Sequence, residues 1–190
     1  MKTIYNAEKE SRTIFNPVLK DTVVFLETSR ETCGEHTLVE VTLAGGGGNP
    51  AHFHDNLSEE FTCFSGELSL EVNGKTLRLL PGQSAVAPAG SKHRFFNRTK
   101  QDCRFKCRVT PGSPGFEQML QITYGMTRDG LMNKHGMPQN PLILGYIFMI
   151  SGTRLTGLIS AVEPLLKWFG KRAIRKGIAA DLQRRYITIH

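Results

Sequence analysis

Short segments of β-forming residues, separated by tight-turn sequences, fill the chain from about residue 13 to residue 110. The clearest signal is a hairpin, in which Leu68–Val72 and Lys75–Leu79 flank Asn73-Gly74, a pair that favours the two-residue type I′ turn. From Thr37 to Leu43, every second residue is Thr, Val or Leu, as in a strand with one buried face. Many short strands at close spacing predict two packed sheets or a closed barrel.

The sequence changes character at Pro111. Ser113-Pro114 and Asn140-Pro141 each place a capping residue before a proline, which is typical of a helix start. Apolar residues after Pro114 recur at helical spacing, and the stretch from Leu165 to Arg185 is amphipathic and basic. We therefore expect a β-barrel domain at residues 1–110. We expect residues 111–190 to be a helical extension packed on the barrel or on the partner in a homodimer.

The net charge of +7 is concentrated near the end of the chain. From Glu163 to His190, seven Lys and Arg residues oppose two acidic residues, an excess of +5. The rest of the chain is close to neutral, so we expect no nucleic-acid partner. The apolar run Leu142–Ile150 is far shorter than the roughly 20 residues that a membrane span needs, so we expect no transmembrane segment. A peripheral contact of the basic C-terminal helix with a membrane surface stays open.

The four cysteines contain no C-x-x-C pair; they are Cys33, Cys63, Cys103 and Cys107. Residues 1–10 are polar and charged and lack the apolar stretch of a signal peptide. We therefore expect reduced thiols in a cytoplasmic protein. The even spacing of Cys103 and Cys107 places both on one face of a strand, most simply as small buried apolar residues.

Three histidines and a glutamate stand out as candidate metal ligands. His52 and His54 are two residues apart, so in a strand their imidazoles point to the same side. Glu59 follows after a short polar stretch, and His93 follows a Pro-x-Gly turn. Imidazole nitrogens with one carboxylate suit Fe, Mn, Ni, Co or Zn. Four such ligands leave positions open on a metal that prefers five or six, as a substrate, water or O₂ requires.

The spacing of these residues resembles the cupin superfamily. Residues 46–66 fit the pattern G-x5-H-x-H-x4-E-x6-G, and residues 82–97 fit G-x5-P-x-G-x2-H-x3-N, at every fixed position. The resemblance implies a double-stranded β-helix, also called a jelly-roll barrel, with His52, His54, Glu59 and His93 as ligands of one divalent transition metal. It gives Asn97 a structural role. Glu60 competes with Glu59, and the motif's spacing to Gly66 favours Glu59.

A barrel of this kind is expected to bind a small organic molecule. Phe61 and Cys63 share the strand parity of Glu59, and Phe95 shares that of His93, so these three are candidates for a substrate pocket. Packing between the sheets explains them equally well. We expect a metalloenzyme, dioxygenase-like or isomerase-like, with Glu59 as a catalytic base. The alternative is a non-catalytic ligand-binding or sensing protein with a structural metal, because fold and ligands alone do not define a reaction.

Overall fold

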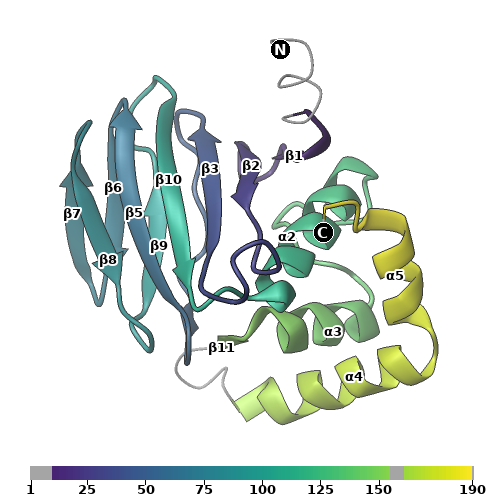
Figure 1. Cartoon of the computed structure of the whole chain (residues 1–190). Coiled ribbons are helices and arrows are strands. Elements are labelled where there is room, and N and C mark those ends of the chain that lie inside the picture. The colour runs from purple at the N-terminus through teal and green to yellow at the C-terminus, as the bar shows by residue number, and fades with distance from the viewer. Residues whose placement is uncertain (1–9, 155–160, 190) are drawn as a thin grey trace.

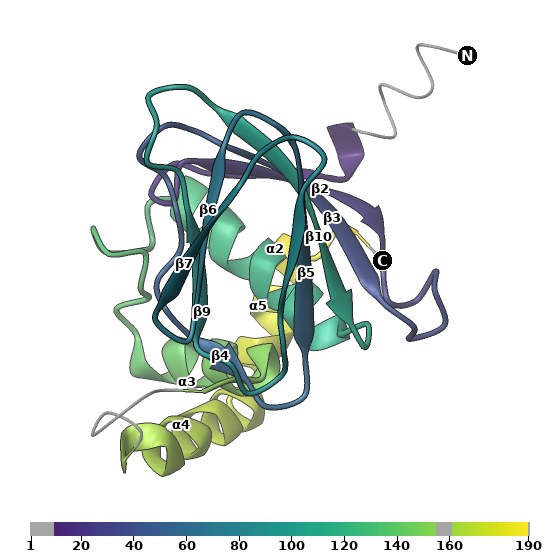
Figure 2. The ribbon, with the colours of Figure 1, turned by 90° about the vertical axis from the view of Figure 1, so that its left-hand side faces the viewer.

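The computed structural model describes residues 10–154 and 161–189. Two antiparallel β-sheets face each other and are followed by a group of helices at one side (Figures 1 and 2). The elements are β1 (Thr13–Asn16), β2 (Asp21–Glu27), β3 (Thr37–Leu43), β4 (Phe53–His54), β5 (Ser58–Ser65), β6 (Leu68–Val72), β7 (Lys75–Leu79), β8 (Ser84–Ala87), β9 (His93–Phe96), β10 (Cys103–Thr110), α2 (Pro114–Arg128), α3 (Pro141–Ser151), β11 (Thr153–Arg154), α4 (Glu163–Arg175) and α5 (Ile178–Tyr186).

The larger sheet has the strand order β1-β2-β3-β10-β5-β8, and the smaller has the order β7-β6-β9. Isolated bridges join the segment before β4 to the smaller sheet, pairing Gly48 with Phe96 and His52 with His93. In Figure 2 the strands of the two sheets form the two walls of a barrel. The predicted jelly-roll barrel with helices at its C-terminal side is therefore confirmed.

The predicted hairpin joins β6 to β7. Asn73 and Gly74 have φ values of 49° and 81°, as the type I′ turn requires at both central positions. The Asn73 side chain also accepts a hydrogen bond from the backbone nitrogen of Lys92, at 3.0 Å. This contact ties the hairpin to the turn that precedes His93, so the local turn chemistry also helps to fix the start of β9.

Strand alternation explains the core between the sheets. In β10, Cys103, Phe105, Cys107 and Val109 are buried, and every residue between them is exposed. β3 repeats the pattern with Thr37, Val39, Val41 and Leu43 on its buried face. Because neighbouring strands present their buried residues to the same side, the two sheets enclose one apolar interior.

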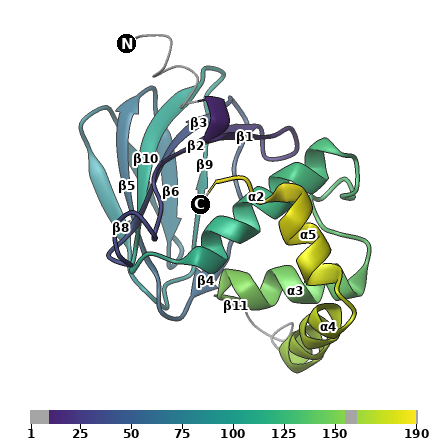
Figure 3. The ribbon, with the colours of Figure 1, turned by 45° about the vertical axis from the view of Figure 1, so that its right-hand side comes forward.

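The helical part shares this core. The Ser113 hydroxyl accepts from the backbone nitrogen of Phe116, and the Asn140 side chain from that of Leu142, which confirms both predicted caps. Phe116 and Tyr124 of α2, and Ile189, join the apolar cluster of the barrel. Figure 3 shows α2 lying between the sheets and the remaining helices. The division of the chain at residue 110 stays a prediction.

Two glycines let α3 and α4 cross in close contact. A Cβ atom on Gly145 would lie 2.4 Å from the carbonyl oxygen of Leu166, and one on Gly170 would lie 2.6 Å from that of Gly145. The basic segment from Leu165 to Arg185 is divided into α4 and α5 at Gly177, whose φ is 74°. Within the described residues, no helix has the length and apolar character needed to cross a membrane.

Candidate metal centre

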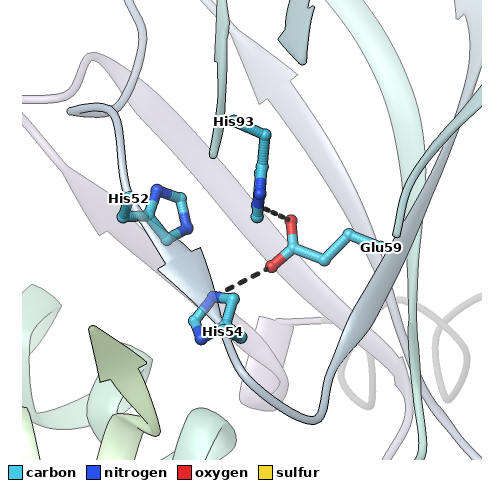
Figure 4. A group of neighbouring side chains, drawn as sticks. All are labelled: His52, His54, Glu59 and His93. Atoms are coloured by element: carbon cyan, nitrogen blue, oxygen red, sulfur yellow. Dashed lines mark ion pairs between the residues drawn. The ribbon is translucent and has the colours of Figure 1, made fainter. Parts of the chain in front are cut away.

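The four candidate ligands come from three strands that the barrel brings together (Figure 4). His52 and His54 lie at β4, Glu59 lies near the start of β5, and His93 begins β9. His52 and His93 form an antiparallel backbone bridge. The backbone nitrogen of His52 donates to the carbonyl oxygen of His93 at 3.0 Å, and the backbone nitrogen of His93 donates to the carbonyl oxygen of His52 at 2.8 Å. The backbone bridge fixes the two histidines relative to each other whatever their side chains bind.

Their side chains converge on one point. One ligand atom from each of the four residues lies within 4.8 Å of all the others. His54, Glu59 and His93 are buried, whereas His52 is half-buried. The two carboxylate oxygens of Glu59 each lie 3.4 Å from an imidazole Nε2, one on His54 and the other on His93. The group therefore offers nitrogen and oxygen donors around a common centre.

Hydrogen bonds on the far side of two imidazoles set their tautomers. Nδ1 of His52 lies 2.9 Å from the carbonyl oxygen of Pro50, and Nδ1 of His93 lies 2.9 Å from that of Ser91. A carbonyl can only accept, so Nδ1 carries the hydrogen in both rings and Nε2 keeps a free lone pair. Metal-binding histidines are commonly held in this way.

Buried nitrogen atoms without hydrogen-bond partners also fit a metal. Among the described residues, both ring nitrogens of His54 and Nε2 of His93 are buried and have no such partner. Leaving buried polar atoms unsatisfied costs free energy, so a group of them needs an explanation. A cation at the centre would satisfy Nε2 of both rings together with the Glu59 carboxylate.

The pKa shifts of His52 and Glu59 favour the neutral imidazole and the charged carboxylate that a metal needs, whereas the shift of His93 favours a proton that a metal would have to displace. Burial lowers the pKa of His52 to about 4, against the opposing effect of Glu59, so its imidazole is neutral at neutral pH. Burial alone would raise the pKa of Glu59, but the imidazoles of His54 and His93 outweigh it and hold the pKa below its usual range. Burial alone would lower the pKa of His93, but the Glu59 carboxylate outweighs it and raises that pKa.

The geometry separates Glu59 from Glu60. Glu59 is 3% exposed and faces the histidines, whereas Glu60 is exposed on the opposite face of β5. Asn97 is buried, and its side-chain nitrogen donates to the backbone oxygens of Leu43 and Gln101. Its contacts are those of a residue that holds the loop after β9.

The three candidate pocket residues belong to the apolar core of the barrel. Phe61 and Cys63 are fully buried, and Phe95 is half-buried. The rings of Phe61 and Phe95 have centroids 6.0 Å apart, and each also contacts the ring of Phe105. Phe61 also approaches the ring of His93, with centroids 6.5 Å apart. Their role in a substrate pocket stays a prediction.

The helical part contributes contacts that sequence reasoning missed. Phe116 of α2 packs its ring on that of His54, with centroids 6.4 Å apart. β11 pairs with β4 and places Thr153 opposite His54. Phe116 is one of the apolar residues that recur at helical spacing after Pro114, but no sequence signal names its partner. The two residues of β11 are too few to give a strand pattern.

A further missed neighbour is Cys107, whose thiol lies 3.9 Å from Oε2 of Glu59. Burial and the nearby carboxylate raise the pKa of this thiol well above its usual range, so the group is a neutral donor. The inward parity of Cys107 follows from the sequence, but its position beside Glu59 depends on the register between β10 and β5.

Comparisons with known proteins agree with the barrel. Residues 39–109 match the family described as the cupin domain. The chain is 29% identical over 96 residues to a probable oxidoreductase, patJ, of Aspergillus clavatus; the match covers 47% of this chain and only 30% of that protein.

Two of the solved structures that resemble part of this chain are a decarboxylase and a cyclase by name. A predicted oxalate decarboxylase of Thermotoga maritima has a TM-score of 0.45 and 19% identity, covering 47% of this chain and 78% of that one. The polyketide cyclase RemF of Streptomyces resistomycificus has a TM-score of 0.43 and 26% identity, covering 47% and 64%. The motif spacing, the barrel of two antiparallel sheets and the family match together show a cupin domain at residues 39–109 of this chain.

Proposed function

We propose that this chain is a metal-binding cupin that holds one divalent transition metal and acts on a small organic molecule. The ligands are His52, His54, Glu59 and His93. The observation that carries the proposal is the convergence of their donor atoms within 4.8 Å of one another, with buried imidazole nitrogens that no hydrogen bond satisfies. The donor set of three imidazoles and one carboxylate suits Fe, Mn, Ni, Co or Zn.

A metal held by these four residues would supply Lewis-acid or redox chemistry to a bound organic ligand. The chain's own residues orient the ligands, accept a proton and exclude water. The carbonyls of Pro50 and Ser91 orient His52 and His93. Glu59, charged and acting as a base, accepts a proton at a carboxylate oxygen. The rings of Phe61 and Phe95 pack together, and Phe61 also approaches the ring of His93, so they make the interior on that side of the centre apolar and exclude water there.

Catalysis is proposed as dioxygenase-like or isomerase-like chemistry. The patJ relative is named a probable oxidoreductase, which favours the first, although this chain spans less than a third of that protein. A non-catalytic sensing protein is the second candidate, favoured by Phe116 and β11, which connect the helices directly to His54. A homodimer and a cytoplasmic location complete the proposal.

The metal is tested by elemental analysis of the purified chain. We expect about one equivalent of a transition metal, and Glu59→Gln should lose most of it because a neutral amide is a poor replacement for a carboxylate ligand. Glu60→Gln is the matched control, since Glu60 is exposed on the other face of the same strand. A chain that takes up no metal, or equal loss in both variants, contradicts the proposal.

Catalysis and sensing are separated with the metal-loaded chain. An enzyme should convert a member of a panel of small organic acids, phenols and sugars, and His54→Ala should abolish that turnover together with the bound metal. A sensing protein should retain a ligand without product and change the hydrogen exchange of α2 and β11 when the ligand binds. Turnover that persists in metal-free protein would exclude the proposed site as its source.

A further inference from the structure

The outward side of α4 combines exposed apolar residues with cations. Leu165 and Trp168 are 53% and 48% exposed, and Lys171, Arg172 and Arg175 are also exposed. These five residues are called the α4 outer face below. Leu165, Trp168, Arg172 and Arg175 follow one another at intervals of three or four residues, so they lie along one line of the helix. The apolar pair occupies its first half and the cations its second half.

The opposite side of α4 fixes this orientation. Gly170 and Ala173 are buried, and Gly170 meets the backbone of Gly145 on α3 so closely that no side chain would fit between them. Figure 1 shows α4 as the outermost element below α3, and Figure 3 shows it near end-on at the edge of the molecule. The α4 outer face therefore points away from the rest of the described chain.

The exposed charge on the α4 outer face is entirely positive. The acidic residue of α4, Glu163, is buried and pairs with Arg154 at 2.9 Å, so it does not offset the exposed cations. The guanidinium of Arg172 lies over the Trp168 ring, 5.6 Å from its centroid. A tryptophan beside arginine and lysine is the combination that occupies the boundary between lipid headgroups and acyl chains.

We propose that the α4 outer face binds the surface of an anionic lipid bilayer. Trp168 and Leu165 would enter the headgroup region, while Lys171, Arg172 and Arg175 would contact lipid phosphates and carboxylates. The charge decides between this occupant and a second copy of the chain. Two copies packed in parallel would oppose cation to cation, and two packed antiparallel would set the apolar pair of each against the cations of the other. An anionic bilayer accepts the apolar pair and neutralises all three cations. The proposal does not depend on the metal centre.

Trp168 makes the test specific, because it is the only tryptophan of the chain. We expect its fluorescence to shift to shorter wavelength when the full chain meets phosphatidylcholine vesicles that contain phosphatidylserine, and not with phosphatidylcholine alone. Added salt should reverse the shift, since exposed charges are screened. Lys171→Glu with Arg175→Glu should weaken vesicle binding by more than about tenfold, because each cation near such a surface contributes about fivefold.

The matched control is Lys75→Glu with Lys134→Glu, two exposed lysines outside α4 that give the same change in net charge. It should retain most of the binding. An unchanged Trp168 spectrum, or equal loss of binding in both double variants, would overturn the proposal. So would an equal shift with soluble polyglutamate, which would show attraction to any polyanion. A particle mass that falls in the α4 variant alone, measured by light scattering, would instead identify the face as a contact between copies.

Discussion

The ring of Phe116 meets the ring of His54 edge-on, with centroids 6.4 Å apart and planes at 83°. Phe116 belongs to the first turn of α2 and His54 to β4 of the barrel. Thr153 lies opposite the same histidine in the pair formed by β4 and β11. The helical part of the chain therefore supports a candidate metal ligand from two directions.

Replacing Phe116 with alanine should weaken both the fold and the metal site. The side chain is 8% exposed, and truncating a buried phenylalanine costs about 3–5 kcal/mol of the free energy of unfolding. Without the ring, His54 loses the surface that orients it, so metal affinity should fall as well. Urea unfolding measures the first effect, and a metal titration below the unfolding transition measures the second.

Two further variants control this experiment. Phe116→Leu keeps apolar contact and should fall between the native chain and Phe116→Ala in both measurements. Phe64→Ala removes a phenylalanine that is 36% exposed on the same barrel, and it should cost less than about 1 kcal/mol. If Phe116→Ala keeps native metal affinity while it is still folded, the ring does not position His54.

Much of the barrel could be predicted because its signals are local. The Asn73-Gly74 turn determines a hairpin from two residues, and alternation identifies the inward face of β10 without knowledge of its neighbours. Alternation also puts Glu59 and Glu60 on opposite faces of a strand, and the motif spacing to Gly66 selected Glu59 as the ligand, the residue that is buried in the structure. The turn depends on positive φ at its two central residues, and the strand faces depend on a side-chain period of two.

The rest depended on contacts between distant parts of the chain. Phe116 and His54 are far apart in sequence, and their meeting requires α2 to dock on one side of the barrel. The division of the basic segment at Gly177 follows from a glycine in the left-handed region, which composition alone did not distinguish from other glycines. Periodicity identifies a buried face but does not name what covers it.

Asp21 gives a pH dependence of stability that can be isolated. Burial raises its pKa to about 6, against the opposing hydrogen bond from the Tyr124 hydroxyl, which lies 2.7 Å from Oδ2. The ordinary value is 3.8, so between about pH 4 and pH 6 the folded chain holds a proton that the unfolded chain has released. Stability contributed by this group therefore falls as pH rises through that window and stays lower above it.

Asp21→Asn should remove this dependence. A shift of about two pKa units corresponds to about 3 kcal/mol, so the free energy of unfolding of the variant relative to the native chain should rise by up to that amount from about pH 4 to pH 7. Chemical denaturation at a series of pH values measures the difference. Asp102→Asn, the same substitution at an exposed position, is the matched control. A flat difference for Asp21→Asn would mean that the buried carboxyl is not protonated in the fold.

Gly170→Ala should destabilise the chain, although glycine to alanine normally stabilises a helix interior by up to about 1 kcal/mol. The added Cβ would lie 2.6 Å from the carbonyl oxygen of Gly145, so α4 must move away from α3. We expect a net loss of about 2 kcal/mol in thermal or urea unfolding. A gain in stability would show that the two helices have room to separate at no cost.

Glu117 connects α2 to the first residue of β3 and to the segment between β2 and β3. Its carboxylate is buried and accepts from the backbone nitrogen of Ser29 at 2.5 Å and from the hydroxyl of Thr37 at 2.6 Å. Its second oxygen accepts from the Ser29 hydroxyl at 3.1 Å. Three donors from the barrel side therefore converge on one side chain of the helical part.

Two substitutions at Glu117 distinguish loss of charge from loss of acceptors. In Glu117→Gln the amide oxygen can keep the two short bonds, and the amide nitrogen can donate to the Ser29 hydroxyl, which reverses its role. We expect a cost of about 1 kcal/mol, because charge-assisted bonds become neutral ones. Glu117→Leu keeps an apolar side chain of similar size but leaves three buried donors unsatisfied, and it should cost about 3 kcal/mol or more. Urea unfolding with equal m-values would measure both, and equal costs for the two variants would show that the charge, rather than the acceptors, holds α2 to the barrel.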